Sequence, residues 1–158
     1  KKLTFLQSDF WEGCPKPIQE ITEAMSLEKG ERILTIWNGN RQVPGKTAVE
    51  EGKGRKENEM ELGGLCLTDR RLVWVAQRGV LGKSMRVRDV IPLEEIESIT
   101  SGGILRKHIS IKTSKGEFSF HLKSWIDGNR RWIDTNWFTP FVEIAIENRK
   151  KELEKKRG

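Results

Sequence analysis

The stretch Gly64-Leu-Cys-Leu-Thr-Asp-Arg-Arg-Leu-Val-Trp-Val-Ala76 consists of two short apolar runs with a polar turn between them. Gly64–Thr68 and Leu72–Ala76 are rich in apolar, β-branched and aromatic residues and predict two strands. Asp69-Arg70-Arg71 is typical of a tight turn. This stretch therefore predicts an antiparallel hairpin, and a chain built from such hairpins has an antiparallel sheet.

Further short segments predict more strands outside this hairpin. Glu31–Trp37 is rich in β-branched residues, and the other segments follow at short intervals with turn residues between them. The last two flank Ser114-Lys115-Gly116, and their apolar and polar residues alternate, so one face of each strand is apolar. The segments after the first hairpin are 84–91, 96–101, 108–113 and 117–122. About seven one-sided antiparallel strands favour a small barrel or sandwich.

One helix is predicted on each side of the strand region. Ile18, Ile21 and Met25 recur at helical spacing and predict a short amphipathic helix near the N-terminus. Residues 139–157 begin with Thr139 as N-cap, are apolar in the first turns and are strongly charged in the last turns. The predicted fold class is mainly β with helices (α+β), with the C-terminal helix capping the strands.

The length of 158 residues suits a single domain spanning 1–158. Residues 38–61 contain several glycines, many charges and few apolar side chains, and predict a long loop with at most an irregular edge strand. The predicted divisions are an N-terminal extension with the short helix (1–26), a β-barrel (27–122), an insertion (124–138) and the C-terminal helix (139–157).

The net charge of +6 is concentrated in the middle of the chain, where residues 63–123 hold 11 basic and 6 acidic side chains. This excess favours an anionic partner such as phospholipid, nucleic acid or an acidic protein face. Cys14 and Cys66 are far apart in sequence and are expected to be reduced, which suits a cytoplasmic protein. No apolar stretch reaches the ~20 residues needed to cross a bilayer, so no transmembrane segment is expected, and a peripheral position at a membrane stays open.

The spacing of polar residues does not match the common nucleotide, metal or catalytic sites. Trp37–Thr47 resembles a phosphate-binding loop, but that motif needs glycine at the position of Asn40. His108 and His121 can meet on the outer face of a hairpin, yet they lack metal-ligand spacing and are interpreted as solvated strand residues. No cofactor, metal site or enzymatic activity is therefore predicted.

A cluster of cations is the main candidate for a binding site. Between residues 67 and 88, six cations accompany one acid, Asp69, and guanidinium groups at hairpin ends can bind phosphate bidentately. A solvated strand edge is the alternative interpretation. A competing basic group on the predicted loop, at Lys46, Lys53, Arg55 and Lys56, is offset by nearby glutamates. The predicted ligand-binding residues, for an anionic headgroup or an acidic partner, are Arg70, Arg71, Lys83, Arg86 and Arg88.

Several segments resemble those of GRAM and bacterial PH-like domains. The hairpin starting at Gly64 resembles their motif G-x-L-x-L-T-(D/N)-x-R-L, and Leu27-Glu-Lys-Gly-Glu-Arg-Ile-Leu34 resembles their opening L-x-x-G-E-x-I-L. Later segments of the family fall in the same order here, at 80–83, 91–96 and 109–118. The hairpin and Arg130-Arg-Trp132 are also similar to GLUE domains of ESCRT-II. The resemblance implies two near-orthogonal antiparallel sheets closed at one end by the C-terminal helix.

For function, the resemblance implies a non-catalytic binding or adaptor module for an anionic membrane surface or a protein partner. The likeness to GLUE domains implies a ubiquitin- or protein-binding module as an alternative. A basic nucleic-acid-binding domain is the weaker alternative, because acidic residues dilute the field and Trp74, Trp132 and Trp137 are predicted to pack in the core. Homo-oligomerisation is left open.

Overall fold

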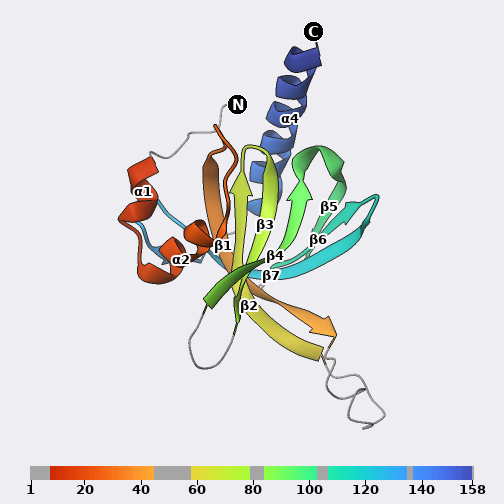
Figure 1. Ribbon diagram of the computed structural model, residues 1–158. Coiled ribbons are helices and arrows are strands. Elements are labelled where there is room, and N and C mark those ends of the chain that lie inside the picture. Colours follow the sequence, from red (N-terminus) through yellow and green to blue (C-terminus); the bar gives the residue numbers. More distant parts are fainter. Residues whose placement is uncertain (1–7, 45–57, 79–83, 103–106, 135–136, 158) are drawn as a thin grey trace.

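The computed structural model describes residues 8–44, 58–78, 84–102, 107–134 and 137–157, and its strands form one antiparallel sheet (Figure 1). The order along the sheet is β4-β3-β2-β1-β7-β6-β5, and β8 pairs with β7. The strands are β1 (Ile33–Pro44), β2 (Asn58–Thr68), β3 (Arg71–Arg78), β4 (Ser84–Pro92), β5 (Ile96–Gly102), β6 (Lys107–Thr113), β7 (Gly116–Ile126) and β8 (Trp132–Ile133). The helices are α1 (Ser8–Glu12), α2 (Lys16–Ala24), the 3-10 turn η1 (Leu93–Glu95) and α4 (Phe138–Arg157). The predicted mainly β, α+β fold is confirmed.

Both predicted hairpins are present and set the direction of the sheet. β2 pairs with β3 from Gly63 opposite Ala76 to Leu67 opposite Leu72. β6 pairs with β7 across the turn at Gly116, which has a φ of 144°. Glycine suits this turn because L-residues with side chains rarely adopt that conformation. Local turn chemistry therefore positions these strand pairs.

The predicted loop over 38–61 is wrong at both ends. β1 continues to Pro44 and β2 begins at Asn58, and the two pair along this whole length. The paired ends extend beyond the other strands in the lower part of Figure 1. The remaining residues of the predicted loop, 45–57, lie outside the described residues.

Two glycines explain why this strand pair resembled a loop in the sequence. Gly39 and Gly63 are register partners in the β1–β2 pair. A Cβ atom on Gly39 would lie 2.1 Å from the carbonyl oxygen of His121, and one on Gly63 would lie 2.2 Å from that of Val75. The backbones approach too closely here for any side chain, so glycine marks a strand crossing and not a loop.

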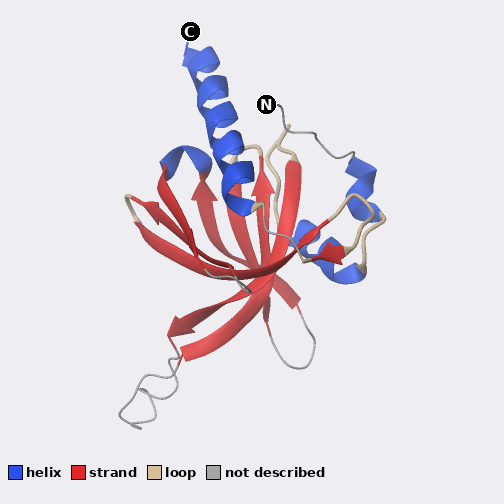
Figure 2. Cartoon of the chain, turned by 180° about the vertical axis from the view of Figure 1, so that it is seen from behind, coloured by secondary structure: helices blue, strands red, loops and turns tan. Residues whose placement is uncertain are grey.

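Two apolar clusters lie on opposite faces of the sheet, since alternate residues of each strand point to opposite sides. The larger cluster, the main core, includes Trp37, Trp74 and Phe120 from the strands and is covered by α4 (Figure 2). The smaller cluster includes Ile18 of α2 and Cys66 of β2. Each large apolar side chain buried in this way contributes roughly 1.5–3 kcal/mol to stability. Below, the face that carries the smaller cluster is called the outer face.

Helix α4 is docked at its beginning and charged at its end, as predicted. Phe138, Val142 and Ala145 are buried, whereas the last turn is basic. The helix begins at Phe138, one residue before the predicted N-cap Thr139. Trp137, which was predicted to pack in the core, is 59% exposed. The core position at the start of α4 is taken by Phe138, which meets Trp37 with ring centroids 4.9 Å apart.

The predicted insertion over 124–138 is partly regular structure. β7 continues to Ile126, and after a turn the short strand β8 pairs back onto it. Asp127 Oδ1 accepts hydrogen bonds from the backbone N–H groups of Asn129 and Arg131, both at 2.9 Å. The turn is therefore stabilised by its own aspartate.

Cys14 and Cys66 are both buried free thiols. Burial raises the pKa of both thiols above the ordinary value, so they act as small apolar side chains. Trp74 is fully buried, as predicted, and Trp132 is half-buried. Within the described residues, the helices are too short or too polar to cross a bilayer.

Candidate binding site

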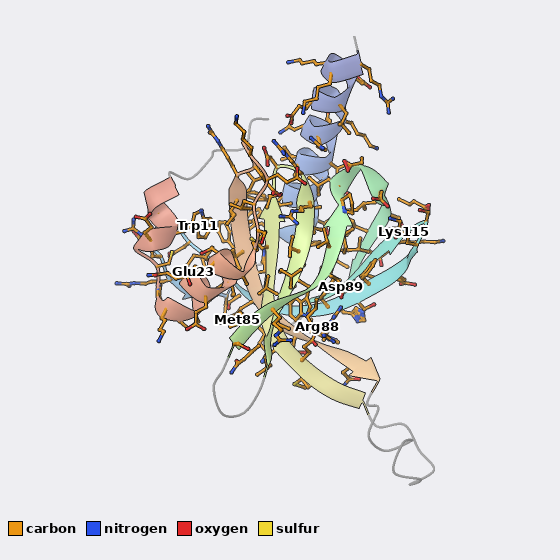
Figure 3. All side chains as sticks on the ribbon, viewed as in Figure 1. Trp11, Glu23, Met85, Arg88, Asp89 and Lys115 are labelled. Carbon is orange, nitrogen blue, oxygen red and sulfur yellow. The ribbon has the colours of Figure 1, made fainter. Side chains whose placement is uncertain are left out.

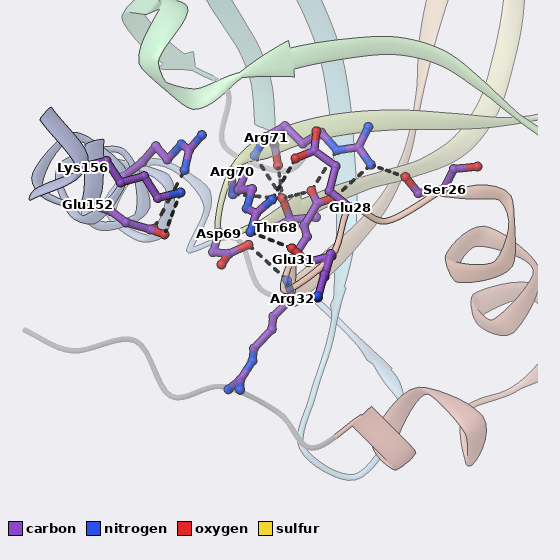
Figure 4. A network of polar contacts seen from close by, with 12 residues as sticks. Ser26, Glu28, Glu31, Arg32, Thr68, Asp69, Arg70, Arg71, Glu152 and Lys156 are labelled. Carbon is purple, nitrogen blue, oxygen red and sulfur yellow. Dashed lines mark hydrogen bonds and ion pairs between the residues drawn. The ribbon is translucent and has the colours of Figure 1, made fainter. Parts of the chain in front are cut away.

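The β2–β3 turn, where Arg70 and Arg71 lie, is held by the hydroxyl group of Thr68 (Figure 4). Thr68 Oγ1 accepts hydrogen bonds from the backbone N–H groups of Arg70 and Arg71, each at 3.0 Å. The same hydroxyl donates to Glu31 Oε2 at 2.7 Å. Thr68 therefore shapes the turn and also ties it to the segment that precedes β1.

Glu31 is a buried carboxylate whose side chain is 0% exposed. Arg71 donates to it through Nε at 2.8 Å and Nη2 at 3.1 Å, and the backbone N–H of Glu28 donates at 2.9 Å. Burial raises the pKa of Glu31, but the hydrogen bonds from Arg71 and Thr68 outweigh this and hold the pKa below its ordinary value. Glu31 is therefore an ionised anchor for the turn.

Both arginines of the turn bind the segment before β1. Arg70 donates from Nη1 to Glu28 Oε2 at 2.8 Å and from Nη2 to the carbonyl oxygen of Lys29 at 3.0 Å. Arg71 Nη2 also donates to the carbonyl oxygen of Ser26 at 3.0 Å. A phosphate group would have to compete with these contacts, so Arg70 and Arg71 have a structural use that the sequence did not indicate.

The strand register separates the predicted cations into two groups. Arg71 is the partner of Pro92, whereas Arg86 is the partner of Ala76. The strand between these positions spans roughly 16 Å. Consecutive hairpin turns lie at opposite ends of the strand they share, so Arg70 and Arg71 do not form one cluster with Arg86.

Of the other predicted site residues, Arg86 and Arg88 lie on β4. Arg88 Nε is 3.1 Å from Glu61 Oε2. Arg86 is exposed and makes no ion pair with another described residue. Lys83 lies outside the described residues, as does the competing basic group at 46–56.

A second ionic group, centred on Arg41, was missed in the sequence. Arg41 Nε lies 2.8 Å from Glu61 Oε1, and Arg41 Nη1 contacts Asp89, which is labelled on β4 in Figure 3. Trp74 Nε1 donates to Glu61 Oε1 at 2.6 Å. The Arg41 guanidinium lies 5.7 Å from the ring centroids of both Trp74 and Phe120. This group closes one end of the main core.

The environment of Glu61 explains why it stays charged there. Burial raises the pKa of Glu61, but hydrogen bonds from Trp74 and Arg41 outweigh burial and lower the pKa below its ordinary value. Arg88 adds a further positive charge nearby. Like Glu31, Glu61 is therefore engaged in holding elements together.

His108 and His121 lie opposite each other on β6 and β7, as expected from the hairpin register. Their ring centroids are 4.7 Å apart. Within the part of the chain that the structure describes, no group of three or more His, Cys, Asp or Glu side chains could hold a metal ion.

A pocket with a volume of about 230 Å³ opens on the outer face of the sheet. Its lining residues come from α2, from β1 to β4 and from β7 and β8: Pro17, Ile21, Asn38, Gly39, Leu62, Gly63, Gln77, Met85, Lys123 and Trp132. Leu62 is 49% exposed, and Met60, two residues earlier on the same face of β2, is 60% exposed. We call this site the outer-face pocket. It could not be recognised in the sequence because its walls come from seven separate elements.

Comparison with protein-family models gives no match for this chain, and comparison with curated proteins gives none either.

Proposed function

We propose that this chain is a non-catalytic binding module of the PH-like class that recognises a protein partner. The observation that carries the proposal is the outer-face pocket with exposed apolar side chains beside it. Exposed apolar patches next to concave surfaces are typical of sites where other proteins dock.

The order of the strands supports the PH-like part of the proposal. β1 to β4 form one run of antiparallel neighbours, β5 to β7 form a second, and β1 joins the two by pairing with β7. Helix α4 follows the last strand and covers the main core. The resemblance implies two sheets, whereas the two runs here belong to one continuous sheet joined at β1. The support for a PH-like module is therefore the succession of two antiparallel runs followed by a C-terminal helix over the core.

The use of the charged residues favours a protein partner over an anionic membrane. Arg41, Arg70, Arg71 and Arg88 each make an ion pair with a carboxylate of the chain. An anionic headgroup at these arginines would have to displace those carboxylates. The apolar surface at the pocket, in contrast, gains free energy when a partner covers it.

The first experiment separates a protein partner from a membrane. The chain is sedimented with phosphatidylcholine vesicles and with vesicles that also contain phosphatidylserine. We expect it to remain in the supernatant in both cases. Sedimentation with phosphatidylserine vesicles that is abolished by Arg86→Glu would overturn the proposal in favour of an anionic membrane ligand.

The second experiment tests the protein partner directly. Wild-type chain, Leu62→Asp and the control Leu27→Asp are used as affinity baits, and each retained protein is purified and titrated against the chain. Leu27 is a suitable control because it is 42% exposed but does not line the pocket. We expect Leu62→Asp to lose the partner and Leu27→Asp to keep it. Equal retention by all three baits would contradict the proposed site.

A further inference from the structure

We propose that the outer-face pocket receives one apolar side chain from an acidic segment of the partner protein, and that Lys123 pairs with a carboxylate next to this side chain. This inference rests on the proposed function as a protein-binding module. It goes further by assigning the chemistry of the bound segment. Four properties of the pocket support it: its size, its walls, its charge and the surface around it.

The size of the pocket suits a side chain better than a whole small molecule. Its volume is about 230 Å³, whereas pockets for small molecules are typically about 300–1,000 Å³. Protein interfaces commonly place one large apolar or aromatic side chain in a pocket of the partner, and such anchors carry much of the binding energy. The volume is therefore in the range for one anchor residue.

The walls of the pocket are more apolar than polar, with Asn38, Gln77 and Lys123 as the polar lining residues, and backbone atoms also line it. Pro17 and Ile21 of α2, Met85 of β4 and Trp132 of β8 contribute apolar groups. Gly39 and Gly63 also line the pocket and present only backbone atoms to it. An inserted side chain would therefore contact methyl, methylene and aromatic groups on several sides, which is the environment that a leucine or phenylalanine side chain favours.

The charge of the pocket favours an acidic partner. Lys123 is the one charged residue among those lining the pocket, and it makes no ion pair with another described residue. The exposed cations Lys16 and Arg131 are sequence neighbours of lining residues, against one uncompensated acidic neighbour, Glu20. The other acidic neighbour is Glu61, next to Leu62, and its charge is neutralised by ion pairs with Arg41 and Arg88. A segment with carboxylates on either side of its apolar residue complements this distribution.

The surface beside the pocket favours a peptide over a single acyl chain. Met60, Leu62, Val87 and Val90 are exposed large apolar residues on β2 and β4. Val87 and Val90 are register partners of Val75 and Val73, which belong to the outer-face cluster, so these side chains share the face of the pocket. A peptide can place its flanking residues on this surface, whereas an acyl chain is bound best in an enclosed channel.

The test uses a defined peptide, acetyl-Glu-Asp-Leu-Asp-Glu-amide, titrated into isotope-labelled chain and followed by NMR. We expect the indole N–H signal of Trp132 and the backbone signal of Gly63 to shift together. Two matched peptides define the chemistry: one has serine in place of leucine, and the other has Gln and Asn in place of the acids. Both are expected to bind at least about five-fold more weakly, because the first lacks the apolar side chain for the pocket and the second lacks the carboxylates for Lys123.

Two variants locate the charge contact. Lys123→Glu is expected to weaken binding of the peptide at least about five-fold, because it replaces an attractive charge at the pocket by a repulsive one. Lys112→Glu is the matched control, since Lys112 is exposed on β6 of the same sheet and does not line the pocket. It is expected to change binding less than about two-fold, because a charge farther away is screened by salt.

The outcomes separate this inference from the proposed function. If the peptides bind equally, or if Lys123→Glu has no effect, the assigned chemistry is wrong, while a captured partner that depends on Leu62 still supports the protein-binding module. If no partner depends on Leu62, the proposed site itself is wrong. Tighter binding of octanoate than of the peptide, with shifts at the same residues, would assign the pocket to an acyl chain and overturn the inference.

Discussion

At the scale of single residues, the partners of a side chain decide what it does. Arg70 and Arg71 have the chemistry of phosphate ligands, but in the folded chain they hold the segment before β1 through Glu28 and Glu31. Arg41 has the same chemistry and closes the core. An arginine can bind an anion of either source, and the fold decides whether that anion belongs to the chain or to a partner.

Replacing Glu31 with alanine is expected to lower the free energy of unfolding by roughly 2–3 kcal/mol, because Arg71 and Thr68 lose a common partner. The loss is smaller than for a fully buried pair because the Arg71 side chain is 18% exposed. Urea unfolding measures it. Glu28→Ala is the control, since this side chain is 65% exposed and its ion pair is worth at most about 1 kcal/mol. Equal losses in the two variants would contradict the anchoring role of Glu31.

Stability should decline in acid through the same carboxylates. The folded pKa values of Glu31 and Glu61 lie below the ordinary value. Their contribution is therefore fully present above the unfolded pKa, roughly 4.3, and is lost as the pH falls through the lower folded pKa. The urea midpoint is expected to be constant between about pH 6 and 8 and to fall below about pH 4.5. Parallel curves for wild type and Glu31→Gln in this acidic range would show that Glu31 is not responsible.

At the scale of the elements, glycine had two opposite uses that sequence patterns do not separate. Gly116 occupies a turn between β6 and β7, as predicted. Gly39 and Gly63 lie inside long strands, where a neighbouring backbone comes too close for a Cβ atom. A glycine in a charged segment therefore does not by itself tell a turn from a close approach between strands.

Gly63→Ala is expected to destabilise the fold by roughly 1–3 kcal/mol, because its Cβ atom would meet a backbone oxygen that no rotamer change can move. Thermal unfolding measures the effect. Gly102→Ala on β5 is the matched control, since no heavy atom lies within 4 Å of a Cβ at that position. It should change stability by less than about 0.5 kcal/mol. A similar loss in both variants would mean that strand propensity, and not the close approach, is the cause.

At the scale of the whole molecule, α4 joins the two runs of strands into one core. Its first turns contact a cluster that draws residues from β1 to β7. Phe138 is 1% exposed, whereas its neighbour Trp137 is 59% exposed. The larger tryptophan is thus outside, because the helix direction and the shape of the core select the residue that fits.

Phe138→Ala is expected to lower the free energy of unfolding by roughly 3–5 kcal/mol, since it leaves a cavity beside Trp37. Trp137→Ala should lower it by less than about 0.5 kcal/mol. Urea unfolding followed by far-ultraviolet circular dichroism compares the two without depending on tryptophan fluorescence. If Trp137→Ala were the more damaging change, the docking of α4 described here would be incorrect.

Most of the fold could be predicted from the sequence, but little of the candidate site could. The hairpin from Gly64 to Ala76 and the later pair around Gly116 follow from alternation and turn residues, which are local properties. The long ends of β1 and β2 were missed because their residues pair through the backbone and have weak strand propensity. The outer-face pocket was missed because Ile21, Leu62 and Trp132 are far apart in the chain.

The sequence by itself determined the antiparallel character of the sheet, the positions of most strands and the two main helices. These features depend on the period of apolar residues and on turns of a few residues, which act within one element or between neighbours. Only the tertiary structure decided that β1 pairs with β7, that Arg71 binds Glu31, and that Lys123 lies at an apolar pocket. Those contacts join residues that are distant in sequence, and they form only when the close-packed core fixes where each strand lies.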